Sequence, residues 1–420
     1  MRDRGLARFQ WDEHMEETFR ESLEDAKKAY KIDDEELEVI EDANSAAEEL
    51  ALPEYEHYLK HEFNSEAPGI LAKYGLLGVP IGKEYGGLGM KPLITTLVKE
   101  RLGQLGLGIS SFINVQSFLT AQTIERWGTS EQKREHLPMA VKSKKVYAFG
   151  LTEPDAGSDP GAMKCTYEEK DGGYVINGTK YLISNGTISD YLLVFARNKN
   201  AMQEISAFIV DTRTDGIERM RLREKIGLFT SDTGMIEMRD VPVAKDSILG
   251  EKGKGLHVAY SALLNARLGV ASSCVGVIEG ALKASVSRAR ERIQHGKEIG
   301  KHQLIQQHIA AMRQNLEMAR WPVYFAAFRK GEYEHDYGNK HLMEEVELRV
   351  SLAKRIASRL AFESADRAVQ VHGGFGYSLL SPVGQLFCDS RVARIYEGTD
   401  EIQDLKIASS ILGREFEAYR

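Results

Sequence analysis

Cysteine is scarce in this chain of 420 residues, which contains only Cys165, Cys274 and Cys388. Their wide separation fits neither the paired cysteines of a zinc site nor a disulfide framework. The eleven histidines show no ligand spacing either. The sequence therefore predicts no metal site, and its cysteine usage fits a reducing, cytoplasmic location.

Long apolar runs and an excess of basic charge are lacking as well. We find no apolar run of the roughly 18 residues that a membrane-spanning helix needs. The formal net charge is −7, which argues against nucleic-acid binding as the main activity. Acidic residues such as Asp12 and Glu13 stand among the basic residues near the N-terminus, which argues against a transit peptide. We expect neither a membrane nor a nucleic acid as a partner.

Helical periodicity dominates both ends of the chain, and strand-like runs occupy its middle. The predicted helices cover residues 19–28, 35–52, 67–74, 92–105, 113–127, 130–141, 256–293, 303–329, 342–371 and 400–412. The predicted strands cover 146–152, 174–176, 180–184, 191–196, 205–210 and 235–238, with turns at Asp171-Gly-Gly, Asn177-Gly, Asn185-Gly and Thr214-Asp-Gly. This order predicts a helical domain over 1–145, a β-sandwich or β-barrel domain over 146–250 and a helical bundle over 251–420.

The order of elements is not the alternating strand and helix order of a parallel nucleotide-binding sheet. No Gly-x-Gly-x-x-Gly motif follows a predicted strand. A nucleotide cofactor would therefore have to bind by another device.

One carboxylate, Glu397, stands between Tyr396 and Gly398, just before the last predicted helix. Either Thr399 or Asp400 can cap that helix, and Gln403 completes a capping-box spacing from Asp400. A fixed and poorly solvated carboxylate on a turn suits a catalytic base. From these residues alone, an ordinary surface glutamate at a helix start is the alternative.

Five motifs, in order along the chain, resemble landmarks of the acyl-CoA dehydrogenase family. They are Phe149–Asp159, Asn265–Arg267, Arg292–Gly296, Gln370–Gly376 and Arg391–Gln403. The succession of helices, strands and helices also agrees with that family's architecture, and the resemblance covers roughly residues 60 to 415. It implies an α+β multidomain fold with an N-terminal helical domain, a central β-domain and a C-terminal four-helix bundle.

The resemblance also implies a function. FAD would lie between the β-domain and the bundle, and an acyl-CoA thioester would be dehydrogenated. Glu397 would take the α-proton while a hydride leaves Cβ for flavin N5. An electron-transferring flavoprotein would accept the electrons, and the protein would form a homotetramer as a dimer of dimers.

The resemblance carries further residues over by position. Those expected at FAD are Phe149, Leu151, Thr152, Gly157, Ser158, Ser184, Arg292, His295, Gln303, Gln370, Gly374, Thr399 and Glu401. Those expected at the substrate are Ser110, Ser158, Arg267 and Gly398. The chain departs from the family pattern at Leu182, Leu264, His295 and Glu401, where the family commonly has an aromatic residue, Asp, Phe, and Gln or Asn.

The Val115-Gln-Ser117 stretch resembles the glutaryl-CoA dehydrogenase branch. That branch binds a distal carboxylate with an arginine, and here Ser110 stands at its position with no basic residue from Ile109 to Asn114. A second carboxylate would then lie in a pocket without a counter-charge, which is costly. We therefore expect a monocarboxylic acyl-CoA and no decarboxylation. Glutaryl-CoA dehydrogenation, enoyl-CoA reduction in the reverse direction, an oxidase and a non-catalytic flavin-binding relative remain alternatives.

Overall fold

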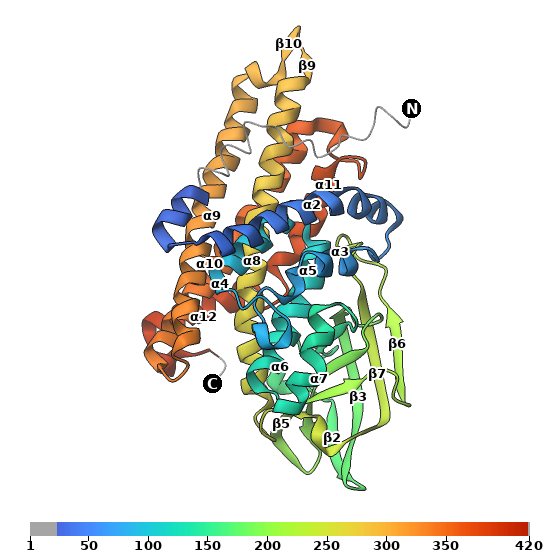
Figure 1. The fold of residues 1–420 in the computed structure, drawn as a ribbon. Helices are drawn as coiled ribbons and strands as arrows, with labels where there is room; N and C mark the ends of the chain where they lie inside the picture. Colours follow the sequence, from blue (N-terminus) through green and yellow to red (C-terminus); the bar gives the residue numbers. More distant parts are fainter. Residues whose placement is uncertain (1–22, 419–420) are drawn as a thin grey trace.

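The computed structural model describes residues 23–418 and shows a β-sheet region flanked by helices from both ends of the chain (Figure 1). Residues 23–30 are helical, and residues 19–22 of the first predicted helix lie outside the described part. The N-terminal helices are α2 (Asp34–Lys60), α3 (Ala67–Lys73), η1 (Leu76–Gly78), η2 (Lys83–Tyr85), α4 (Pro92–Gly103), α5 (Leu107–Ile113), η3 (Asn114–Ala121), α6 (Gln122–Trp127) and α7 (Ser130–Val141).

Local capping signals set the starts of two of these helices. Asp33 and Glu36 form a capping box at the start of α2, with backbone-to-side-chain bonds of 2.9 and 3.1 Å. Thr129 and Gln132 form another at the start of α7. Each box satisfies two backbone N–H groups that a helix start leaves open.

The predicted helix over 113–127 is not one regular α-helix. It comprises the end of α5, the π-helical segment η3 and α6. Thr120 Oγ1 donates back to the carbonyls of Val115 and Gln116, at 2.9 and 2.6 Å. Such back-bonding competes with the helix ladder and bends it, and π-helical turns are frequent at functional sites.

The strands form one eight-stranded sheet in the order β6-β7-β3-β2-β4-β5-β8, with β1 paired to β4. They are β1 (Tyr147–Gly150), β2 (Thr166–Lys170), β3 (Gly173–Ser184), β4 (Tyr191–Asn198), β5 (Ala201–Asp211), β6 (Ile217–Arg221), β7 (Thr233–Val243) and β8 (Ile248–Leu249). Most pairs are antiparallel, but β4 pairs in parallel with both β1 and β2.

The predicted turn at Asn177-Gly178 was wrong. Both residues lie inside β3, where the register with β7 shifts between Ile176 and Gly178. Gly178 has φ +147°, and a Cβ there would approach Cα of Cys165 to 2.6 Å. Glycine therefore serves a close approach of two strands at a bulge rather than a hairpin turn.

The C-terminal region is built on three long helices, with α8 in contact with α4, α9, α10 and β5. Its elements are α8 (Gly255–Glu291), β9 (Ile293–Gln294), β10 (Lys297–Glu298), η6 (Ile299–Lys301), α9 (Gln303–His335), α10 (Lys340–His372), η7 (Gly373–Phe375), α11 (Pro382–Ser390), η8 (Arg391–Arg394), α12 (Asp400–Leu412) and η9 (Arg414–Phe416). The sequence patterns did not predict α11. Helix α8 runs from the sheet to the β9–β10 hairpin at the opposite end of the molecule (Figure 1).

By length and composition alone, helix α8 is apolar enough to cross a membrane. The sequence analysis did not predict this, because it considered only uninterrupted apolar runs. However, 83% of its most apolar window is buried inside the fold. Helices α4, α9 and α10 supply this cover, so the apolar character of α8 is that of a core helix.

Candidate active site

Glu397 lies on the tight turn between η8 and α12 in a left-handed backbone conformation, with φ +55°. This conformation costs a residue with a side chain about 1 kcal/mol or more. Gly398 follows with φ +90°, and a Cβ there would come within 2.7 Å of Gln403 Nε2. The turn therefore requires glycine at 398 and imposes strain at Glu397.

Neighbouring helices hold this turn by its carbonyl groups. Arg267 Nε of α8 donates to the Glu397 carbonyl at 3.0 Å, and Lys354 Nζ of α10 donates to the Gly398 carbonyl at 2.8 Å. Gln403 Nε2 donates to the Gly398 carbonyl at 3.0 Å. Three side chains from α8, α10 and α12 thus stabilise the strained conformation.

The structure settles how α12 begins. Thr399 is the N-cap, and its Oγ1 accepts from the N–H of Ile402 at 3.2 Å. Gln403 does not complete a capping box with Asp400, because its amide bonds to the turn carbonyls instead. Asp400 is buried and accepts from Arg394 Nε at 2.7 Å. The capping-box prediction was wrong, because the side chain of Asp400 bonds to Arg394 and that of Gln403 bonds to the turn carbonyls.

The backbone N–H and the carboxylate of Glu397 are available to a ligand. Within residues 23–418, neither its backbone N–H nor its carboxylate has a hydrogen-bond or ion-pair partner. Burial raises the pKa of the Glu397 carboxyl to about 7, and the positive charges of Arg267, Lys354 and Lys99 oppose the rise. A carboxylate with this pKa is a stronger base than an exposed glutamate.

A cavity opens in front of Glu397. Three of its lining residues, Glu397, Ser110 and Ser184, are sites that the resemblance predicted. The others are Lys99, Ser111, Asn114, Val115, Val270, Ser273 and Tyr396. The cavity therefore joins residues from α4, α5, η3, β3, α8 and the Glu397 turn.

Lys99 corrects the expectation of a pocket without a positive charge. The stretch from Ile109 to Asn114 has no basic residue, but α4 brings Lys99 to the same cavity as Ser110. Only 1% of Lys99 is exposed. The expectation considered only the stretch from Ile109 to Asn114, whereas the positive charge comes from α4.

Strand β3 brings one predicted FAD residue of the β-domain to the cavity and is bonded to a second. Ser184 lines it, and in the same strand the N–H of Tyr181 donates to the Thr152 carbonyl at 2.9 Å. Leu182 exposes 54% of its surface in a left-handed conformation with φ +56°. An uncovered apolar side chain two residues before Ser184 can be covered by a planar ring system such as a flavin.

Two of the predicted residues at the end of β1 are part of the core. Phe149 and Leu151 are each 8% exposed and pack in a cluster with helix residues. The Leu151 carbonyl accepts from Lys180 Nζ at 3.2 Å. Their side chains therefore belong to the core, and their expected contact with FAD through the backbone stays a prediction.

The loop that follows is held by Glu153. This carboxylate is buried, pairs with Lys180 at 2.8 Å and accepts from the N–H of Cys165 at 3.1 Å. Gly157 and Ser158 lie further along the loop and are exposed. Their predicted roles at FAD and substrate stay predictions.

A second group of predicted residues lies at the other end of α8 and is exposed. Arg292, His295 and Gln303 surround the β9–β10 hairpin, far from the sheet (Figure 1). At the end of α10, Gln370 and Gly374 are also exposed. Within a single chain, these residues therefore do not reach the Glu397 cavity. Their expected contact with the FAD of a neighbouring subunit stays a prediction.

Glu401 lies exposed on the first turn of α12 and does not line the cavity. Hydrogen bonds from its own backbone and from Thr399 lower the pKa of its carboxyl. Its predicted contact with FAD stays a prediction.

Sequence reasoning missed Lys99, Lys354 and Tyr396. A signal for Lys99 existed, because Lys99-Glu100-Arg101 interrupts a helix whose apolar residues nearly encircle it. All twelve residues of α4 are buried, so charged side chains there must face protein or a cavity. The sequence alone did not show which.

Comparison with known proteins covers almost the whole described chain. Three family models match in succession: the acyl-CoA dehydrogenase N-terminal domain over residues 33–144, the middle domain over 148–241 and the C-terminal domain over 253–412. An acyl-CoA dehydrogenase of Bacillus subtilis is 35% identical over 82% of this chain and 88% of its own length.

Two further similarities concern a reductase and a solved structure. The acryloyl-CoA reductase (NADH) of Anaerotignum propionicum is 36% identical over 84% of this chain and 88% of its own length. The solved butyryl-CoA dehydrogenase of Megasphaera elsdenii superposes with a TM-score of 0.84 at 33% identity, over 91% of this chain and 99% of that chain.

Proposed function

Since this chain belongs to the acyl-CoA dehydrogenase family of flavin-dependent oxidoreductases, we propose that it removes two hydrogens from the α,β-positions of an acyl-CoA thioester, with Glu397 as the base. The cofactor is FAD, which solved relatives contain. FAD accepts a hydride from the substrate Cβ when it is bound.

The proposal rests on Glu397, which lines the cavity. Within residues 23–418, its carboxylate and its backbone N–H both have no hydrogen-bond partner. A proton on Cα of a thioester is weakly acidic, so the base needs a raised pKa and the thioester carbonyl needs a donor. Glu397 supplies both, because burial raises its pKa to about 7 and its N–H has no partner within the described residues.

The surrounding side chains position Glu397 rather than react. Arg267 and Lys354 bond to the carbonyls of Glu397 and Gly398, so they fix the direction of the turn. Their charges also limit the rise of the Glu397 pKa. The carboxylate therefore remains partly ionised near neutral pH, as a base must be.

The residues that we propose for FAD form two groups. Thr152, Ser184 and the Glu397 turn would meet the flavin ring, which is supported by Ser184 and Glu397 lining one cavity and by the exposed Leu182 two residues before Ser184. Arg292 would bind the pyrophosphate of FAD in a neighbouring subunit, as a guanidinium suits two phosphate oxygens. A homotetramer, an electron-transferring flavoprotein as acceptor and a cytoplasmic location stay predictions.

The direction of the reaction has a second candidate. The acryloyl-CoA reductase and the acyl-CoA dehydrogenase named above have nearly equal identity to this chain, at 36% and 35%. Reduction of a 2-enoyl-CoA would use the same Glu397, as the donor of the α-proton. The presence of Glu397 disfavours a non-catalytic flavin-binding relative.

Anaerobic bleaching of the flavin tests the proposal. The FAD-loaded protein should lose its flavin absorbance when acyl-CoAs are added, and Glu397→Gln should bleach about 10²- to 10⁴-fold more slowly, the usual contribution of a positioned base. Asp404→Asn is the matched control, because Asp404 of α12 pairs with Arg355 of α10 and does not line the cavity. A protein that takes up no FAD, or a Glu397→Gln variant that bleaches normally, would refute the proposal.

A further inference from the structure

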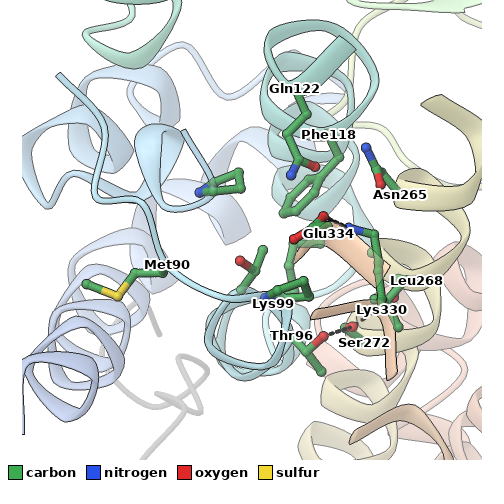
Figure 2. A pocket seen from close by; sticks show the side chains of 14 residues that line it. Met90, Thr96, Lys99, Phe118, Gln122, Asn265, Leu268, Ser272, Lys330 and Glu334 are labelled. Carbon is green, nitrogen blue, oxygen red and sulfur yellow. Dashed lines mark hydrogen bonds and ion pairs between the residues drawn. The ribbon is translucent and has the colours of Figure 1, made fainter. Parts of the chain in front are cut away.

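Lys99 is the one residue that lines both the Glu397 cavity and a neighbouring cavity. The neighbouring cavity is formed by residues of α4, η3, α6, α8 and α9 together with the loop before α4. Figure 2 shows Lys99 in this second cavity between Phe118 and Thr96, with the paired Lys330 and Glu334 nearby. Lys99 therefore stands between the two spaces, at a border of the cavity that Glu397 faces.

The contacts of the Lys99 ammonium are uncharged. Its Nζ donates to the Ser110 carbonyl at 2.7 Å and lies 3.5 Å from Asn114 Oδ1. It also lies 5.4 Å from the centre of the Phe118 ring. Over the described chain, no carboxylate comes within ion-pair distance of Lys99, although it is 1% exposed. A buried ammonium with three N–H donors thus lacks an anionic partner.

A second polar group in the same cavity is open. Ser110 is 2% exposed, and its Oγ has no hydrogen-bond partner within residues 23–418. Its carbonyl is the closest acceptor of Lys99, so the two residues are adjacent. An unpaired buried hydroxyl is destabilising, and a hydrogen bond to a ligand oxygen would offset this cost.

The charge of the site favours an anion. Glu397 is the one carboxylate among the cavity-lining residues, while Lys99, Arg267 and Lys354 act on it with positive charge. Arg267 and Lys354 already bond to turn carbonyls, so Lys99 is the cation left for a ligand. A carboxylate placed against Lys99 and Ser110 would meet both an ammonium and a hydroxyl donor.

We propose that Lys99 and Ser110 form an anion-recognising end of the acyl pocket, and that the preferred acyl group ends in a carboxylate. The inference rests on the proposed function, because it names the substrate class of the same site. It reverses the expectation of a monocarboxylic acyl group, whose ground was the missing counter-charge. The dehydrogenation itself is unchanged: Glu397 takes a proton from Cα, and a hydride leaves Cβ for the FAD.

Pairs of acyl-CoAs of equal carbon number test the inference. We compare pentanoyl-CoA with glutaryl-CoA, and hexanoyl-CoA with adipyl-CoA, by kcat/KM of anaerobic flavin bleaching. The wild-type protein should prefer the dicarboxylic member of at least one pair by about 10- to 100-fold, the value of a hydrogen bond to a charged group. Lys99→Met should remove this preference mainly through KM, and Lys99→Arg should restore part of it.

Lys330→Met is the matched control. Lys330 is a buried lysine of the neighbouring cavity, but it is paired with Glu334 and does not line the Glu397 cavity. Its variant should keep the wild-type preference. If Lys99→Met does not fold, Ser110→Ala should still reduce the preference severalfold.

A binding measurement separates recognition from turnover. Glu397→Gln should bind glutaryl-CoA or adipyl-CoA more tightly than the monocarboxylic partner by calorimetry, and the added Lys99→Met should abolish the difference. Equal binding of both members of each pair, or a preference that Lys99→Met leaves intact, overturns the inference. Bleaching by pentanoyl-CoA without any dicarboxylic preference would refute this inference alone, whereas a flavin that no acyl-CoA bleaches would refute the proposed function.

Discussion

Helix α4 contains two kinds of buried charge in three consecutive residues. Glu100 and Arg101 point into the helical core, where they join Arg320 and Glu279. Lys99 points to the active-site cavity, where its neighbours are a carbonyl, an amide and an aromatic ring. Consecutive helix residues are turned by about 100° from one another, so one helix serves both regions.

The core network satisfies its carboxylates completely. Arg320 bonds to Glu100 at 2.6 Å and to Glu279 at 2.9 Å, and Arg101 bonds to Glu279 at 3.1 Å. Tyr324 donates to the second oxygen of Glu100 at 2.8 Å. Although burial acts to raise the pKa of Glu279, nearby cations including Arg101 and Arg320 hold it well below its usual range. Each carboxylate oxygen of Glu100 and Glu279 therefore has a partner within the fold.

Structural and functional buried charges differ in where their partners lie. A buried charge whose partners all lie within the fold stabilises the structure. Its removal leaves the partner charges buried without a counter-charge. A buried charge that faces a cavity and has only neutral partners is available to a ligand. Burial alone does not distinguish Arg320 from Lys99, since both are at most 1% exposed.

Among the predictions, we expect the largest change in the free energy of unfolding when the shared cation of the core network is removed. Arg320→Met leaves Glu100 and Glu279 without their shared cation and should lower the free energy of unfolding by about 3–5 kcal/mol, measured by urea denaturation. Arg313→Met is the control, because Arg313 forms an exposed pair with Glu317 on the same helix, worth about 0–1 kcal/mol. Equal stability of the two variants would show that the network is not structural.

The second prediction concerns pH at the cavity. Because Glu397 acts as a base only when ionised, kcat/KM for bleaching should fall about tenfold per pH unit below its pKa of about 7. Arg267, Lys354 and Lys99 each lower that pKa, so Lys99→Met should move the acidic limb of the profile to higher pH. An acidic limb near pH 4.5 in both proteins would contradict the raised pKa of Glu397.

The smallest effect is expected for stability at Lys99. Burial lowers the pKa of Lys99 to about 7, so the folded protein disfavours its charge more than the unfolded chain does. The contribution of Lys99 to stability is therefore least favourable below pH 7 and improves as pH rises from 7 toward 10.5. Lys99→Met should equal or exceed the wild type in stability at pH 6.5, and should remove this slope.

A large loss of stability in Lys99→Met at pH 6.5, similar to that of Arg320→Met, would place Lys99 among the structural charges. Thermal or urea unfolding of both variants in the same buffer makes this comparison directly.

Much of the fold followed from local patterns. Helices α7 and α12 begin and end where amphipathic spacing predicted, because Thr129 and Thr399 cap them locally. The turn before α12 also followed from the sequence, since Gly398 must adopt a positive φ. In contrast, Asn177-Gly178 has a strong turn pattern but lies in a bulge, because β7 extends the pairing past it.

The order of the helical and β segments, the turn before α12 and the carboxylate on it follow from local sequence, because backbone propensities and capping act over a few residues. The surroundings of Glu397 depend on the packing of distant segments. Arg267, Lys354 and Lys99 come from three different helices, and the pKa of Glu397 depends on all of them. Since charge interactions and burial act through space, the positive end of the pocket came from α4 and not from the stretch beside Ser110.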